Sequence, residues 1–116
     1  MLKVLLVDDE PFIVQGLSAL IDWEKEGFEI VGTAGNGSEA VEFLKSNPVD
    51  LILADIKMPV MNGLEFLKYI RETHLSEAFF VILSGYGDFT YAKEAIKWQC
   101  TCLLYTSDAA DDLIGV

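Results

Sequence analysis

The chain has 116 residues, which is one domain's worth, and 52% of them are hydrophobic, so it can bury a sizeable core. Its 19 acidic residues against 8 basic ones give a net charge of −11, which argues against direct nucleic-acid binding because such a surface repels phosphate backbones. No window approaches the ~18 apolar residues of a membrane span, and the first apolar run ends at once in Asp8-Asp9-Glu10, unlike a signal peptide. We expect a cytoplasmic protein that does not bind a membrane.

The elements alternate along the chain, and short apolar runs mark strands while helical spacing of apolar residues marks helices. In chain order we predict a strand over Lys3–Val7, a helix from Pro11 to Ile21, a strand over Phe28–Thr33, a helix from Ser38 to Ser46, a strand over Val49–Ala54, a helix capped by Asn62, a strand over Phe79–Leu83 and a helix from Asp88 to about Trp98.

The strands are apolar nearly throughout, which predicts burial on both faces of a parallel sheet. Alternation with helices and right-handed crossovers then give an α/β fold with a doubly wound parallel sheet. In such folds ligands bind beyond the carboxyl ends of the strands. The candidate site is therefore expected at that edge.

Polar residues end three of the predicted strands: Asp8 and Asp9 the first, Asp55 the third and Ser84 the fourth. The fold rule sends all of them to one edge of the sheet. Carboxylates that close together repel one another, and a raised pKa or a bound cation relieves this. Oxygen ligands without Cys or His favour Mg²⁺.

Asp55 is the candidate nucleophile, because a carboxylate can attack phosphorus and this one is central in the group. Phosphoryl transfer depends on positioning and charge neutralisation, and a dication supplies the latter. The Ser84 hydroxyl would donate a hydrogen bond to a phosphoryl oxygen. A single strand-end Asp or Ser is more often a cap or turn residue, so the hypothesis depends on the whole group.

Three loops carry a family resemblance. The segments Val7–Pro11, Asp55–Gly63 and Leu83–Asp88 resemble, in sequence, order and spacing, the signature loops of bacterial two-component response-regulator receiver domains.

The resemblance implies a role for each site residue. Asp55 would be the phosphoacceptor, Asp8 and Asp9 would hold Mg²⁺ together with Asp55, and the backbone carbonyl of Lys57 would complete the metal site. Ser84 would be the switch hydroxyl. The implied fold is flavodoxin-like with strand order 2-1-3-4-5, and the implied role is signalling rather than enzymatic, with a sensor histidine kinase as partner.

A narrower resemblance concerns the output. The segments Ile21–Glu24, Gly27–Gly32 and Ser84–Phe89 resemble receivers fused to AraC-type helix-turn-helix domains, which regulate transcription. The resemblance implies a fused DNA-binding output domain in the full-length parent and allows a phosphorylation-dependent dimer.

The resemblance stops near residue 101. A receiver would continue with a fifth strand, a Lys-Pro pair and a fifth helix, with the Lys near Thr106. This sequence has no Lys near that position. Leu103–Tyr105 can imitate a strand, but we expect the fifth strand and helix to be degraded or missing. The stretch Cys102–Asp111 is what a transposon-end sequencing adaptor encodes when read in frame. We interpret residues 1–101 as an incomplete receiver domain and 102–116 as a non-native tail, which the codons of the native gene would test.

Two other functions remain open. A Mg²⁺-dependent phosphohydrolase with an Asp nucleophile would want an acid-base Asp two residues later, where Asp55 has Lys57. A non-phosphorylated pseudo-receiver that acts as a docking module fits the missing Lys but not the intact acids. The glycines Gly32, Gly35 and Gly37 do not match a dinucleotide fingerprint, and we interpret them as turn glycines.

Overall fold

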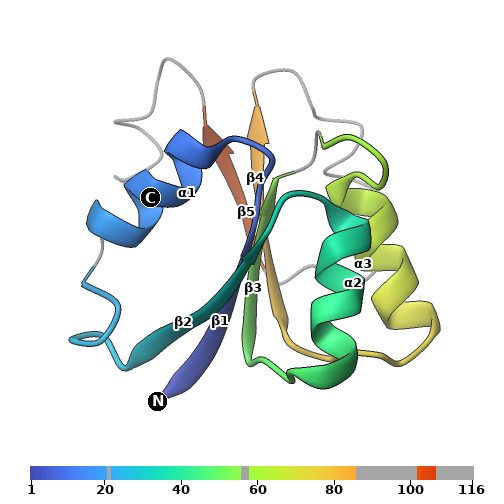
Figure 1. The fold of residues 1–116 in the computed structure, drawn as a ribbon, viewed down its shortest axis with the longest axis horizontal. Coiled ribbons are helices and arrows are strands. Elements are labelled where there is room, and N and C mark those ends of the chain that lie inside the picture. The colour runs from blue at the N-terminus through green and yellow to red at the C-terminus, as the bar shows by residue number, and fades with distance from the viewer. Residues whose placement is uncertain (21, 56–57, 86–101, 107–116) are drawn as a thin grey trace.

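A computed structural model describes residues 1–20, 22–55, 58–85 and 102–106 of the chain (Figure 1). Its elements, in chain order, are β1 (Leu2–Val7), α1 (Pro11–Leu20), β2 (Phe28–Ala34), α2 (Gly37–Ser46), β3 (Leu51–Asp55), α3 (Gly63–Glu72), β4 (Phe79–Gly85) and β5 (Cys102–Thr106).

The five strands form one sheet in the order β2-β1-β3-β4-β5, and every neighbouring pair is parallel. The predicted α/β fold with its doubly wound parallel sheet and its strand order is thus confirmed. All strands point the same way, so their carboxyl ends share the upper edge of the sheet in Figure 1.

The fifth strand differs from expectation. We expected it to be degraded or missing, yet the backbone of Cys102–Thr106 pairs in parallel with β4 from Val81 to Gly85. The physical reason is that backbone pairing along an exposed strand edge needs only a segment of adequate β-propensity, which Leu103–Tyr105 supplies. The expected fifth helix falls on residues 107–116, outside the described part of the chain.

One face of the sheet carries the main core, covered by α2 and α3 (Figure 1). The side chains from β1, β3 and β4 that face this way alternate with those on the other face, as the pleat of a strand requires. Phe66 of α3 is fully buried and packs on Phe80 of β4, with ring centroids 5.6 Å apart.

Among the described residues, α1 is the helix that covers the other face (Figure 1). Val14 and Leu17 pack there against the strands, and Trp23 closes the end of the helix by donating a 3.0 Å hydrogen bond from its indole N–H to the Leu17 carbonyl. The apolar side chains of Phe12 and Ile13, in the same helix, are 82% and 44% exposed. At 100° per residue, a face centred on Val14 and Leu17 leaves Phe12 on the opposite side of the helix and Ile13 at the margin of that face, in line with their exposure.

Helix boundaries are set by side-chain caps. α2 begins one residue before the predicted Ser38, because the Asn36 side chain accepts from the Glu39 N–H and makes Asn36 the cap. α3 begins as predicted after Asn62, which forms a reciprocal capping box with Glu65. The predicted helix from Asp88 to Trp98 lies outside the described residues. Within the described residues, no helix is long and apolar enough to cross a membrane.

Gly16 lies inside α1, and a Cβ placed on it would meet no atom of the described residues within 4 Å outside the backbone of its own helix. Gly16→Ala should therefore stabilise the fold by up to about 1 kcal/mol, because alanine loses less backbone entropy on entering a helix. Urea unfolding followed by circular dichroism measures the change. A loss of stability would show that another part of the chain packs against α1 at Gly16 and leaves no room for a methyl group.

Candidate metal and phosphoacceptor site

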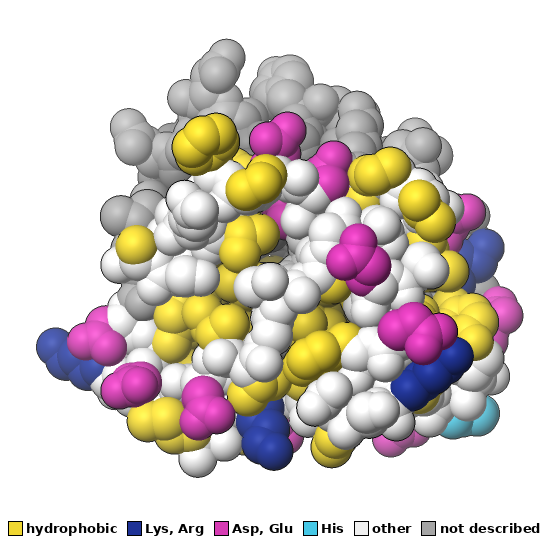
Figure 2. All heavy atoms as spheres, in the orientation of Figure 1, with side chains coloured by type: hydrophobic (Ala, Val, Ile, Leu, Met, Phe, Trp, Pro, Cys, Tyr) yellow, Lys and Arg dark blue, Asp and Glu magenta, His cyan; other side chains and the backbone are white. Residues whose placement is uncertain are grey.

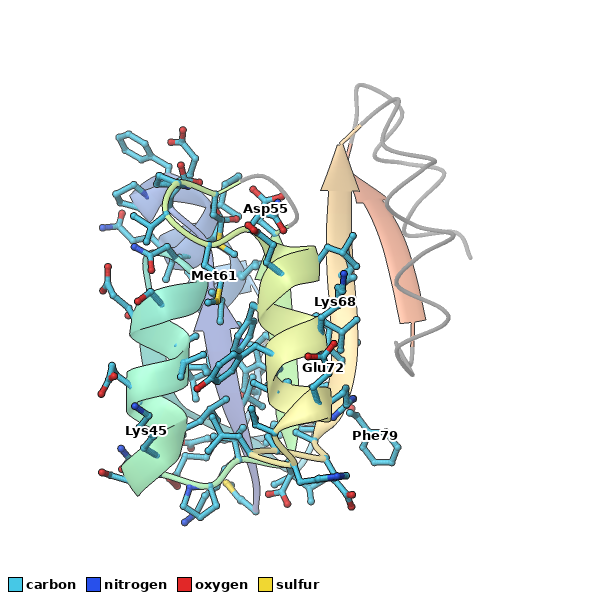
Figure 3. All side chains as sticks on the ribbon, turned by 90° about the vertical axis from the view of Figure 1, so that its right-hand side faces the viewer. Lys45, Asp55, Met61, Lys68, Glu72 and Phe79 are labelled. Atoms are coloured by element: carbon cyan, nitrogen blue, oxygen red, sulfur yellow. The ribbon has the colours of Figure 1, made fainter. Side chains whose placement is uncertain are left out.

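The register of the sheet brings the predicted acids together. Val7 of β1 lies opposite Ala54 of β3, so the residues that follow them, Asp8 just after β1 and Asp55 at the end of β3, lie side by side at the carboxyl edge of the sheet. Both strands are fixed by burial, since Val7 and Ala54 are essentially inaccessible to solvent. In Figure 3, Asp55 lies at the carboxyl end of β3, above the first turn of α3.

The three acids form one cluster. Asp8, Asp9 and Asp55 each offer a carboxylate oxygen, and these oxygens all lie within 4.8 Å of one another. Asp8 is only 8% exposed, Asp9 is exposed and Asp55 is half-buried, so the cluster opens to solvent on one side. Figure 2 shows acidic side chains at this upper edge of the molecule. The predicted convergence is therefore present in the structure.

Asp8 bears the electrostatic strain of the cluster. Burial raises the pKa of Asp8 above its usual range, and the adjacent Asp9 carboxylate adds to the rise. A 2.9 Å hydrogen bond from the Glu10 N–H to Asp8 Oδ1 opposes the shift and fixes the orientation of the carboxylate. The site thus holds negative charge that a cation would stabilise.

The donor set fits Mg²⁺. All three side chains offer oxygen, the described part of the cluster holds no Cys or His, and the solvent-facing side leaves room for the waters that Mg²⁺ keeps. The fourth predicted donor, the Lys57 carbonyl, lies outside the described residues.

The loop after Asp55 is tightly folded where the structure describes it. Met58 is buried, and Val60 has a φ of 67°, an unfavourable value for a β-branched residue. The Met61 N–H donates to the Pro59 carbonyl at 2.7 Å, which closes a three-residue γ-turn centred on Val60. We call residues 56–62 the acceptor loop.

Ser84 comes to the same edge through its backbone. It lies in β4 opposite Tyr105, one residue beyond Leu83, which pairs with Asp55. Its hydroxyl is not among the described side chains, so its role as a switch stays a prediction.

The sequence did not reveal that Gly37 lies at the start of a helix in close contact with Met61 and Phe66. The structure places Gly32 within β2 and Gly37 at the start of α2, rather than in turns. No spacing rule marks either position, because the reason for a glycine there is the space taken by a neighbouring segment.

Comparison with known proteins agrees with this geometry. The sequence model of the family described as "Response regulator receiver domain" matches residues 4–107. The chain belongs to this family.

The receiver domain is similar to bacterial transcriptional regulators. It is 43% identical over 98 residues to the uncharacterized transcriptional regulatory protein YesN of Bacillus subtilis, covering 84% of this chain and 26% of YesN. It is 37% identical over 97 residues to the transcriptional regulatory protein HptR of Staphylococcus aureus strain N315, covering 84% of this chain and 37% of HptR. The receiver domain thus spans well under half the length of these relatives.

Solved structures give the same fold. The REC domain of AraT, a response regulator from Geobacillus stearothermophilus, superposes with a TM-score of 0.82 at 38% identity, covering 90% of this chain and 81% of that one. A two-component transcriptional regulator AraC from Clostridium phytofermentans ISDg gives a TM-score of 0.82 at 29% identity, covering 99% and 89%.

Asp8→Asn tests the electrostatic strain. Because burial raises the folded-state pKa of Asp8, this group favours folding only below its unfolded pKa, about 3.9, and that contribution is lost as the pH rises through the folded value. At pH 7 without metal, the neutral amide should therefore stabilise the fold by about 1 kcal/mol, the scale of one like-charge pair a few ångströms apart near water.

Urea unfolding at pH 7 and pH 3 measures the difference between Asp8→Asn and the unchanged chain. The two should converge at pH 3, and added MgCl₂ should stabilise the unchanged chain more than the variant. Equal stability of Asp8→Asn and the unchanged chain at pH 7 without metal would show that the Asp8 carboxylate does not destabilise the fold.

Proposed function

We propose that this receiver domain accepts a phosphoryl group from a sensor histidine kinase onto Asp55, with Mg²⁺ held by Asp8, Asp9, Asp55 and the Lys57 backbone carbonyl. The observation that carries the proposal is the convergence of the three carboxylates within 4.8 Å at the carboxyl edge of the sheet. Membership of the receiver family supports the same assignment.

The transfer is a displacement at phosphorus. An Asp55 oxygen attacks the phosphorus of a phosphohistidine, a P–O bond forms, the P–N bond breaks, and the imidazole nitrogen leaves with the electron pair. The product is an acyl phosphate on Asp55. No general acid or base is required, because positioning and charge neutralisation supply most of the catalysis.

The chain's residues prepare this step by orientation and charge. Asp8 is held by the Glu10 N–H, and the exposed Asp9 completes the group on the solvent side. When bound, Mg²⁺ neutralises charge between these carboxylates and the incoming phosphoryl oxygens. Asp55 is half-buried at the end of β3, so the strand fixes the direction from which its carboxylate can attack the phosphorus.

Phosphorylation would then change a surface for output. The added oxygens give the Ser84 hydroxyl an acceptor, and movement of this hydroxyl toward the phosphoryl group shifts a two-state surface around the helix predicted from Asp88 to Trp98. The similarity to transcriptional regulators supports a fused output domain in the full-length parent, and the AraC-type structural relative supports that class, with a phosphorylation-dependent dimer as one means of switching. We place the receiver in residues 1–101 and keep 102–116 as a non-native tail.

Labelling by a small phosphodonor tests the acceptor. With acetyl phosphate and MgCl₂, the unchanged chain should gain one phosphoryl group per molecule by intact mass, and Asp55→Asn should gain none, because the amide is not a nucleophile. Omitting Mg²⁺ should abolish labelling of the unchanged chain.

Asp50→Asn is the matched control, because Asp50 immediately precedes β3 while Asp55 ends the same strand. Its carboxylate accepts a 2.8 Å hydrogen bond from the Lys3 N–H, which the amide oxygen of Asn can still accept. This variant should label like the unchanged chain. Labelling of Asp55→Asn at the normal rate would overturn the assignment, and sustained release of phosphate from a small ester would favour a phosphohydrolase instead. No labelling of any variant, with the fold intact, would favour the pseudo-receiver.

Restoring a cation at the fifth strand should improve labelling. The backbone of Thr106 lies at the carboxyl end of β5 opposite Gly85, at the same edge as Asp55. Thr106→Lys should raise the rate with acetyl phosphate by roughly tenfold, below the about 10²–10³-fold that one well-placed charge-stabilising group contributes. Thr106→Gln, similar in reach but neutral, is the control. Equal rates for the two variants would show that a cation here plays no part.

A further inference from the structure

The acceptor loop is hydrogen-bonded to the first residue of α2, Gly37. The Gly37 N–H donates a 2.9 Å hydrogen bond to the Met61 carbonyl. A Cβ on Gly37 would lie 2.7 Å from Met61 Cγ, 2.9 Å from the Met61 carbonyl oxygen and 2.8 Å from Phe66 Cβ, all closer than such atoms approach in folded proteins. Figure 3 shows Met61 between the upper ends of α2 and α3.

Space rather than backbone freedom explains this glycine. Among the described glycines, Gly27 has a positive φ and Gly37 does not. Alanine could therefore adopt the backbone conformation of Gly37. What excludes a side chain is the end of the acceptor loop together with Phe66 in the first turn of α3. Two of the three nearest atoms belong to Met61, one of them in the backbone.

Neither side of this contact can yield easily. Gly37 is held as the first residue of α2 by the cap at Asn36, whose side chain accepts from the Glu39 N–H at 2.9 Å. Met61 is held between the γ-turn at Val60 and the capping box that begins at Asn62. A side chain on Gly37 would therefore displace the end of the acceptor loop as a unit.

We propose that Gly37 is a positioning residue for the phosphoacceptor site. Its close approach fixes the far end of the loop that starts at Asp55 and contains the carbonyl assigned to the metal, and so it sets the geometry in which Mg²⁺ is held. The inference rests on the proposed function, since it concerns the same site. Gly37 touches neither metal nor substrate and acts through Met61.

Mg²⁺ affinity of Gly37→Ala provides the test, measured on the full chain by two-dimensional NMR titration with MgCl₂. Supporting residues behind metal ligands typically change affinity by 10–100-fold, so the dissociation constant should rise roughly tenfold. The amide signals of residues 58–62 should shift before any metal is added. Every variant carries Gly16→Ala, which should keep the clash from unfolding the chain.

Gly32→Ala is the matched control. A Cβ there would lie 2.5 Å from the Phe43 ring on the same helix α2, so it also strains the packing between β2 and α2, but it does not touch the acceptor loop. This variant should lose stability while its Mg²⁺ dissociation constant changes less than twofold. If Gly37→Ala does not fold, the double variant Gly37→Ala/Met61→Ala takes its place; it removes the 2.7 Å contact to Met61 Cγ and keeps those to the Met61 carbonyl oxygen and to Phe66 Cβ.

The outcomes separate the two proposals. A normal Mg²⁺ affinity in folded Gly37→Ala, or an equal loss in Gly32→Ala, would overturn the positioning role and leave the proposed function intact. Absence of Mg²⁺ binding by the chain with native glycines at positions 32 and 37 would defeat the proposed function and this inference with it.

Discussion

The pairing of β1 with β3 is the constraint on which the site depends. Val7 faces Ala54 across the sheet, and buried apolar residues hold both strands in that register. A slip by one residue would turn the buried side chains of a strand to its other face, so the register is strongly fixed. Asp8 and Asp55 must then leave the sheet together despite their repulsion. Burial of the strands holds the acids together, at a cost that shows in the pKa of Asp8, which burial and the adjacent Asp9 carboxylate raise.

Sequence patterns predicted what depends on apolar strands and missed what depends on close contacts. The runs around Val7 and Ala54 are apolar enough to identify buried parallel strands, and the carboxyl-end rule then places the acids correctly. The sequence pattern does not identify the sheet-facing side of α1, because apolar residues such as Phe12 occur on more than one side of it. Gly37 was missed because its neighbour, Met61, lies 24 positions along the chain, and no local pattern records the space that another segment needs.

The fifth strand shows why pairing and origin are separate questions. β4 without β5 would be an edge with free N–H and C=O groups, and such an edge accepts any segment that can extend beside it. The pairing of Cys102–Thr106 uses backbone atoms, so it demands β-propensity and reach rather than a particular evolved sequence. An adaptor-encoded segment that happens to contain Leu103–Tyr105 meets both conditions. The presence of β5 is therefore compatible with a non-native tail.

The acceptor loop extends the argument from charges to backbone geometry. Val60 adopts a φ that costs a β-branched residue about 1–3 kcal/mol, and such a conformation persists only where the surroundings enforce it. Here the enforcement comes from burial of Met58 on one side and from the Gly37 hydrogen bond and the Asn62 cap on the other. Residues 58–62 of the loop are therefore held by contacts on both sides. If the proposed metal site takes its fourth ligand from this loop, contacts of the described residues 58–62 with α2 and α3 would support it as well as its acids.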